Sequence, residues 1–198
     1  MIGTHHITIF AATLYIATIT LFVALHLADR QQRFLADAVS NYALGPASGL
    51  FVVYVIVGSV AALCLGIAVL ASGLLPVRVG VYLLALTALR GGILVFRVDR
   101  PGEARTTSGK LHYAFAVATF ALTYMVLSAA AVPADRIAGG AFNGTNVTLS
   151  WVTALALAGV VLCLLPAFRA TFGLAERLFL GSSLLGLTLL SIVLAQAT

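Results

Sequence analysis

Asp99 and His112 are the two residues of this sequence best suited to acid–base chemistry, and both belong to one polar segment. A histidine can carry a proton near neutral pH, an aspartate can orient it, and a hydroxyl such as that of Ser40 can attack an ester or phosphoryl group. The sequence contains no GxSxG, HExxH, P-loop or CxxC motif to support a catalytic assignment. The alternative interpretation is that Thr107 or Ser108 caps a helix and that His112 lines the lipid headgroup region.

Three arginines are candidates to bind an anion. Arg90 lies well inside an apolar run, and Arg97 and Arg100 follow it in the polar segment. A charged side chain in hydrocarbon is costly and usually has a role. Arg90 could therefore bind an anion or a lipid phosphate, or pair with an acidic residue such as Glu176. It could also reach the membrane surface along its own aliphatic stem.

Two histidines at similar depth on different helices could also ligate haem axially, as in membrane b-type cytochromes. His26 and His112 both lie near the ends of apolar runs, close to the interface, whereas bis-histidine haem sites generally need more shelter. A b-type haem stays an alternative on these grounds. Otherwise we expect no cofactor and no metal site.

Six apolar runs must position these residues. The sequence is 62% hydrophobic and only 9% charged, against a charged fraction of about 25% in ordinary soluble domains. Each run holds roughly 20 continuously apolar residues, enough to cross the hydrocarbon as a helix, whereas a barrel would show short alternating segments. The sequence predicts an all-α polytopic membrane protein, one domain over residues 1–198, made of a single bundle of six transmembrane helices. The spans are expected at about 7–28, 49–75, 77–95, 111–132, 149–168 and 178–195.

The distribution of basic residues predicts the orientation of these spans. With six spans both termini share a side, where the loops carry only Arg78 and Arg136. The positive-inside rule therefore places both termini outside. Residue usage, rich in arginine, alanine and glycine, suggests a bacterial inner (plasma) membrane. The net charge of +5 is then explained by topology and anionic lipid headgroups, with no nucleic-acid partner. The basic residues expected in the cytoplasm are Arg30, Arg33, Arg97, Arg100, Arg105, Lys110, Arg169 and Arg177.

Two connections have interpretable patterns. The first, from Asp29 to Ser48, places apolar residues at helical spacing and ends at Gly45-Pro46. It predicts a short amphipathic helix at the interface, or a continuation of the first span. The fourth connection, from Pro133 to Thr148, is rich in glycine and asparagine, and we expect a flexible exterior loop.

Three short motifs, in this order along the chain, resemble those of a known membrane family. They are Ser40-Asn41-Tyr42-Ala43-Leu44-Gly45, then Phe96-Arg97-Val98-Asp99-Arg100-Pro101-Gly102 with Gly109-Lys110-Leu111-His112, and finally Gly173-Leu174-Ala175-Glu176-Arg177. Their placement relative to six spans is similar to that in the prokaryotic membrane family catalogued as domain of unknown function nine hundred and ninety-eight. The resemblance covers nearly the whole chain. It departs at Arg97, where the family often has a proline.

The resemblance implies a set of signature residues but no activity, because the family has none established. The implied signature, which falls on one predicted face, is Ser40, Tyr42, Asp99, His112, Glu176 and Arg177.

The leading hypothesis is an integral membrane protein whose cytoplasmic-facing polar pocket binds an anionic lipid or a similar amphiphile. Arg90, Arg97 and Arg100 would hold the anion, and Asp99 with His112 would supply hydrogen-bond or proton chemistry. Two alternatives use the same residues differently: a lipid-modifying enzyme, or an accessory or structural subunit of a membrane complex. The expected partners are membrane lipids, with a second copy of the chain or a membrane-complex subunit as further candidates. The predicted ligand-binding residues also include Tyr42, Glu176 and Arg177.

Overall fold

The computed structural model describes residues 2–100 and 102–198, and its elements are helices joined by short connections. The long helices are α1 (Ile2–Ala28), α2 (Ser48–Ser72), α3 (Val77–Val95), α4 (Thr107–Ala138), α5 (Thr145–Leu162) and α6 (Phe172–Ala197). Short 3-10 helices, η1 (Val39–Leu44), η2 (Gly140–Phe142) and η3 (Pro166–Thr171), lie in the connections. The described residues contain no strand, so the predicted all-α class is confirmed.

Each of the six long helices is long and apolar enough to cross a membrane. A helix needs about 20 predominantly apolar residues to do so, and the shortest of the six, α5, has 18. The predicted bundle of six apolar helices is therefore confirmed, and the architecture is that of a multi-pass membrane protein. The observed helices α1, α4 and α6 extend beyond the predicted spans, whereas α2 and α3 agree with them closely.

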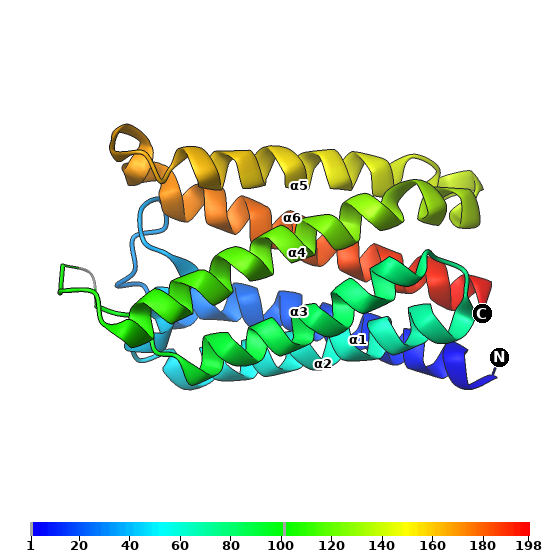
Figure 1. Ribbon diagram of the computed structural model, residues 1–198, viewed down its shortest axis with the longest axis horizontal. Helices are drawn as coiled ribbons and strands as arrows, with labels where there is room; N and C mark the ends of the chain where they lie inside the picture. Colours follow the sequence, from blue (N-terminus) through cyan, green and yellow to red (C-terminus); the bar gives the residue numbers. More distant parts are fainter. Residues whose placement is uncertain (1, 101) are drawn as a thin grey trace.

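The long helices form a closed ring in the order of the sequence. Each packs against its neighbours in the chain, and α6 closes the ring on α1 and also contacts α4. Both termini lie at one end of the bundle, at the right in Figure 1. The connections 29–47 and 163–171, with the described residues 96–100 and 102–106 of the third, lie at the opposite end, which we call the loop end. The polar motifs of the sequence are therefore gathered at the loop end.

Helix α4 crosses the bundle obliquely, and its first half lies close to α3 (Figure 1). The cause is visible at Gly92, where the Phe115 ring packs directly on the α3 backbone in the space that a Cβ would occupy. Phe96 stacks on the same ring with 5.4 Å between the ring centroids. Aromatic pairs at this separation attract one another beyond their simple burial. The first half of α4 is thereby drawn toward α3 and away from α5.

The first connection is not the predicted amphipathic α-helix. It consists of turns followed by η1, because the Leu35 carbonyl and the Val39 N–H, which would pair with each other in an α-helix, bond to α6 instead. The Leu35 carbonyl accepts a hydrogen bond from the Leu174 N–H at 3.0 Å, and the Val39 N–H donates to the Glu176 carboxylate at 2.7 Å. A backbone group used in this way cannot also close a helical turn. Tertiary contacts have therefore overridden the helical spacing of the apolar residues.

A local ion pair fixes the turn within this connection. The Asp37 carboxylate accepts hydrogen bonds from the Arg33 backbone N–H at 2.7 Å and from the Arg33 guanidinium at 3.0 Å. Partial burial raises the pKa of Asp37, but these hydrogen bonds and the nearby arginine charge outweigh it and leave the pKa below its usual value. The carboxylate therefore stays ionised and keeps the turn closed.

The fourth connection is shorter and more ordered than the sequence suggested. Helix α4 continues through Pro133 to Ala138, and α5 begins at Thr145. Buried Asp135 holds the start of α5: it accepts from the Asn146 N–H at 3.0 Å, the Asn146 side-chain amide at 2.7 Å and the Val147 N–H at 3.1 Å. A carboxylate at a helix N-terminus satisfies unpaired N–H groups and the helix dipole together. The predicted flexible loop is therefore pinned at both ends.

Because Asp135 caps α5, its replacement should cause a measurable loss of stability. Asp135→Ala leaves the Asn146 side-chain amide and two backbone N–H groups without their acceptor, so we expect the free energy of unfolding to fall by about 2 kcal/mol. Thermal unfolding of the purified protein in detergent measures the change. The control is Arg136→Ala at the exposed neighbouring position, which should leave the melting temperature nearly unchanged. Equal melting temperatures for the two variants would contradict the assigned role.

Candidate functional site

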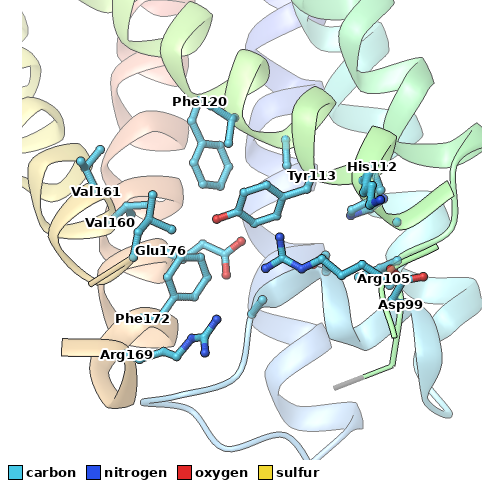
Figure 2. A pocket seen from close by; sticks show the side chains of 18 of the residues that line it. Asp99, Arg105, His112, Tyr113, Phe120, Val160, Val161, Arg169, Phe172 and Glu176 are labelled. Atoms are coloured by element: carbon cyan, nitrogen blue, oxygen red, sulfur yellow. The ribbon is translucent and has the colours of Figure 1, made fainter. Parts of the chain in front are cut away.

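A cavity of about 680 Å³ opens at the loop end between α4, α5 and α6. Its walls come from the first half of α4, the last turns of α5, η3, the first turn of α6 and the loop that follows α3. Figure 2 shows this space and the side chains around it. The cavity lies where α4 leans toward α3, so the oblique crossing of α4 creates the room for it.

One wall of the cavity is apolar and is built from α4, α5 and the start of α6. Because α5 and α4 diverge at this end, their facing side chains do not meet but line the space between them. A wall of this composition suits a hydrocarbon chain, which can pack against it by van der Waals contacts. Its principal residues are Val117, Phe120, Leu157, Val160, Leu164 and Phe172.

Basic residues line the opening of the cavity. Arg100, Arg105, Lys110 and Arg169 all contribute to its lining. Arg100 lies 3.9 Å from Glu103, but both side chains are well exposed, and such surface pairs contribute little. The Arg105 guanidinium lies over the Tyr113 ring at 5.6 Å.

Three of these cations have no acidic partner. Within residues 2–100 and 102–198, no ion pair involves Arg105, Lys110 or Arg169. All three side chains are exposed, so they remain hydrated and can exchange water for an anion. The opening of the cavity therefore carries positive charge next to an apolar wall.

His112 lies at the polar, inner end of the cavity and is 4% exposed. Its Nδ1 lies 2.8 Å from the Phe96 carbonyl oxygen. Because a carbonyl only accepts, Nδ1 carries the proton and donates, and in the neutral ring Nε2 is an acceptor. Nε2 is buried and has no hydrogen-bond partner among the described residues.

Glu176 also lines the cavity and is 6% exposed. One carboxylate oxygen, Oε2, accepts a hydrogen bond from the Val39 N–H at 2.7 Å. In the described chain Glu176 forms no ion pair. Figure 2 shows the carboxyl group directed into the space that Tyr113 and Arg105 also face. Glu176 therefore offers a second acceptor at the inner end.

Arg177, the next residue, points away from the cavity and holds the first connection. Its Nε donates to His26 Nε2 at 2.8 Å, and Nη1 donates to the carbonyls of Asp37 at 2.7 Å and Gly173 at 2.9 Å. Nη2 lies 3.4 Å from the Tyr42 hydroxyl. The sequence interpretation had placed Tyr42 and Arg177 with the ligand-binding residues. The structure places them instead in a buried network that does not line the cavity.

The same network bears on the haem alternative. His26 Nδ1 donates to the Phe22 carbonyl at 2.6 Å, and Nε2 accepts from Arg177. Both ring nitrogens are therefore engaged by the protein, and a ligand to haem iron needs one nitrogen free. The arrangement does not bring His26 and His112 together as an axial pair.

Asp99 has a structural contact that explains its position. Its carboxylate accepts from the Thr106 hydroxyl at 2.6 Å and from the Thr106 N–H at 3.0 Å. The Thr106 hydroxyl oxygen in turn accepts from the Gly109 N–H at 3.0 Å, so Thr106 is the N-cap of α4. The expected cap at Thr107 or Ser108 is therefore wrong. Asp99 lines the cavity with His112, but no hydrogen bond joins the two in the described chain.

The remaining predicted arginines occupy different places. The Arg97 side chain is exposed and lines none of the cavities at this end, while its backbone N–H donates to the Ser108 hydroxyl at 2.8 Å. Arg90 is buried and lines a separate inner chamber of about 70 Å³. A Cβ at Gly58 would meet its guanidinium at 2.5 Å, so this glycine gives the charge its room.

The inner chamber adjoins the cavity. Ser40, His112 and Glu176 line both spaces, and they form the polar part of the wall between them. Tyr54 and Thr119 complete the polar lining of the chamber, and the Thr119 hydroxyl has no hydrogen-bond partner in the part of the chain that is described. Arg90 is therefore near Glu176 without being within ion-pair distance.

Sequence reasoning missed several lining residues. Arg105, Lys110 and Arg169 had been interpreted only as topological charges, and neither Tyr113 nor Thr119 had been singled out. A basic residue after an apolar run carries no signal that distinguishes a lipid-facing position from a solvated one. Only the divergence of α4 from α5 reveals that these cations share a cavity.

Comparison of the chain with known protein families, curated proteins and solved structures found no match. The site is therefore interpreted from its own geometry.

The hydrogen bonds of Arg177 predict that the stability of the protein depends strongly on the shape of this guanidinium group. Arg177→Lys keeps the charge but cannot reach His26, Asp37 and Tyr42 at once. We expect a loss of about 2–4 kcal/mol in the free energy of unfolding, since each hydrogen bond to a charged group contributes about 1.5–3 kcal/mol. We also expect faster proteolysis within the connection 29–47. Arg169→Lys is the control, and an unchanged cleavage rate for the Arg177 variant would contradict the assignment.

Proposed function

We propose that this protein binds an anionic lipid in the cavity at the loop end. The observation that carries the proposal is the combination of three unpaired cations with an apolar wall in one cavity. A lipid phosphate would lie against Arg105, Lys110 and Arg169, and an acyl chain would extend along Phe120 and its apolar neighbours. Asp99 would act indirectly by holding the loop that carries Arg100 and Arg105.

The magnitudes of the two contributions favour an amphiphile over a simple anion. A basic residue near an anionic membrane surface contributes about 1 kcal/mol, and an acyl chain adds van der Waals contacts along the apolar wall. Three exposed cations alone would therefore bind a small anion weakly. An acyl chain that packs along the apolar wall adds these contacts to the charge interaction, so a lipid is held at two places and a small anion at one.

The loop end would face the cytoplasm of a bacterial inner membrane, with both termini outside. The burial of Arg177 removes one of the eight basic residues from the topological count. Seven exposed basic residues remain at the loop end against Arg78 and Arg136 at the other end. This imbalance still favours the cytoplasmic assignment, and the cytoplasmic leaflet is where anionic lipids give a negative surface potential.

A lipid-modifying enzyme is a second candidate, favoured by the unpartnered Nε2 of His112 and by the presence of Ser40 in the same cavity lining. In this role His112 would accept a proton from Ser40 or from a substrate hydroxyl, oriented by the Phe96 carbonyl instead of Asp99. Loss of turnover on His112→Ala with lipid binding retained would support catalysis.

We further propose that the chain belongs to the prokaryotic membrane family that its three motifs resemble. The support is that Tyr42 and Arg177, from two of the motifs, meet in one network, and that Glu176 and His112 meet in one cavity.

Replacing the cations tests the lipid proposal. Arg105→Gln combined with Arg169→Gln should weaken binding of an anionic phospholipid by about 2 kcal/mol, roughly thirtyfold. Native mass spectrometry of the detergent-solubilised protein with added lipid measures the affinity. The matched control is Arg97→Gln combined with Arg30→Gln, which removes two exposed arginines at the same end that do not line the cavity. Equal loss in both double variants would show bulk surface attraction and contradict the proposed site.

Filling the space beside the apolar wall tests the proposal that the acyl chain of the lipid lies there. Ala121 lines the cavity on α4, so Ala121→Trp should occupy the space of several methylenes and weaken long-chain lipid binding about tenfold or more. Binding of the same lipid with very short chains should fall much less. Ala114→Trp, on an exposed part of α4 outside the cavity, is the control. Unaltered long-chain affinity in Ala121→Trp would place the acyl chain elsewhere.

A further inference from the structure

The inner end of the cavity presents hydrogen-bond acceptors, whereas its opening presents cations. The two acceptors are His112 Nε2 and the second carboxylate oxygen of Glu176. An anionic lipid that filled only the basic opening would leave His112 Nε2 unsatisfied and would make no use of Glu176. The identity of the headgroup can therefore be inferred from what these two groups require.

His112 requires a donor from outside the protein. Its tautomer is fixed because Nδ1 donates to the Phe96 carbonyl, so in the neutral ring Nε2 is an acceptor, on a residue that lines both the cavity and the adjoining chamber. A buried acceptor left without a donor costs about 1–3 kcal/mol. No donor reaches Nε2 from the described residues.

Glu176 offers a second hydrogen-bonding group at this end of the cavity. The Val39 N–H occupies only Oε2, and no hydrogen bond from the described residues reaches Oε1. A carboxyl oxygen has two acceptor sites, and a hydroxyl can donate to it or accept from it. The hydroxyls of Ser40 and Tyr113, which can donate or accept, also line this end and can adjust to a ligand that brings several donors.

We infer that the lipid carries a hydroxylated headgroup, of the phosphoglycerol type, and this inference rests on the proposed lipid-binding function. The phosphate pairs with the cations at the opening while headgroup hydroxyls donate to His112 Nε2 and Glu176. An amine headgroup is disfavoured because a zwitterionic lipid has no net charge to offer Arg105, Lys110 and Arg169. A bare phosphate headgroup is disfavoured because it brings further acceptors to an end already lined with them.

The expected difference in affinity between lipid headgroups follows from the protein groups that a headgroup without hydroxyls would leave unpaired. A site built to hydrogen-bond a hydroxyl rejects an analogue that lacks it, because the buried protein groups are then left unpaired. We expect the protein to bind phosphatidylglycerol at least about tenfold more tightly than phosphatidic acid or phosphatidylethanolamine with the same acyl chains.

The test compares these three lipids by native mass spectrometry on the full-length protein in one detergent. Glu176→Gln is the main variant: its amide oxygen can still accept from Val39, but the amide group then presents donors to the cavity. Its preference for phosphatidylglycerol over phosphatidic acid should fall to about threefold or less. His112→Phe should reduce the same preference. The control is Thr123→Val, whose hydroxyl is buried on α4 away from the cavity.

The outcomes separate this inference from the function on which it rests. Equal affinity of the unaltered protein for phosphatidylglycerol and phosphatidic acid, or tighter binding of phosphatidylethanolamine, would overturn the hydroxyl inference and leave an anionic or amine-lipid site. Absence of saturable binding by any of the three lipids would overturn the proposed function itself. An unaltered preference in both Glu176→Gln and His112→Phe would place the discriminating groups elsewhere. Melting temperatures near that of the unaltered protein establish that the variants are folded.

Discussion

The buried guanidinium of Arg177 is the interaction on which the loop end of this protein depends. It joins α1 through His26, the first connection through Asp37 and α6 through its own backbone. A buried charge is tolerated only when it is well satisfied. Here the charge is met by neutral acceptors and by the Phe34 ring at 4.8 Å, without a carboxylate. Because no acidic partner is consumed, Glu176 stays available to the cavity.

Glu176 and Arg177 are adjacent in the sequence, but helix geometry directs one to the cavity and the other to the first connection. Successive side chains on an α-helix point about 100° apart, since there are 3.6 residues per turn. On α6 this rotation turns Arg177 toward the first connection and Glu176 toward the cavity. The contact of Val39 with Glu176 and that of Asp37 with Arg177 then fix the same connection on both sides. The position of the acceptor in the cavity is therefore set by the same segment that closes the bundle.

The sequence predicted the elements of this fold better than the site. Continuous apolar runs are a strong signal, so the six helices and the concentration of polar groups at one end followed directly. The first connection was misjudged because helical spacing reports local preference, and its carbonyls bond to α6 instead. Asp99 was assigned a chemical role because a carboxylate near a histidine suggests one, whereas its partner is the cap residue Thr106. The cations of the site could not be identified, because nothing local encodes the packing of Phe115 on Gly92 that moves α4 away from α5.

Arg90 lies deeper in the bundle than the cations of the loop end and is close to the same acidic residue, Glu176. It shares a chamber of about 70 Å³ with Glu176, a space comparable to about two water molecules. A polar space of that size with several hydrogen-bonding walls holds water, whereas an apolar one stays dry. Water can therefore join the Arg90 guanidinium to Glu176 and to the unpaired Thr119 hydroxyl. Glu176 then lies between the Arg90 chamber and the basic opening of the cavity, and its second oxygen stays open to a hydroxyl of the ligand.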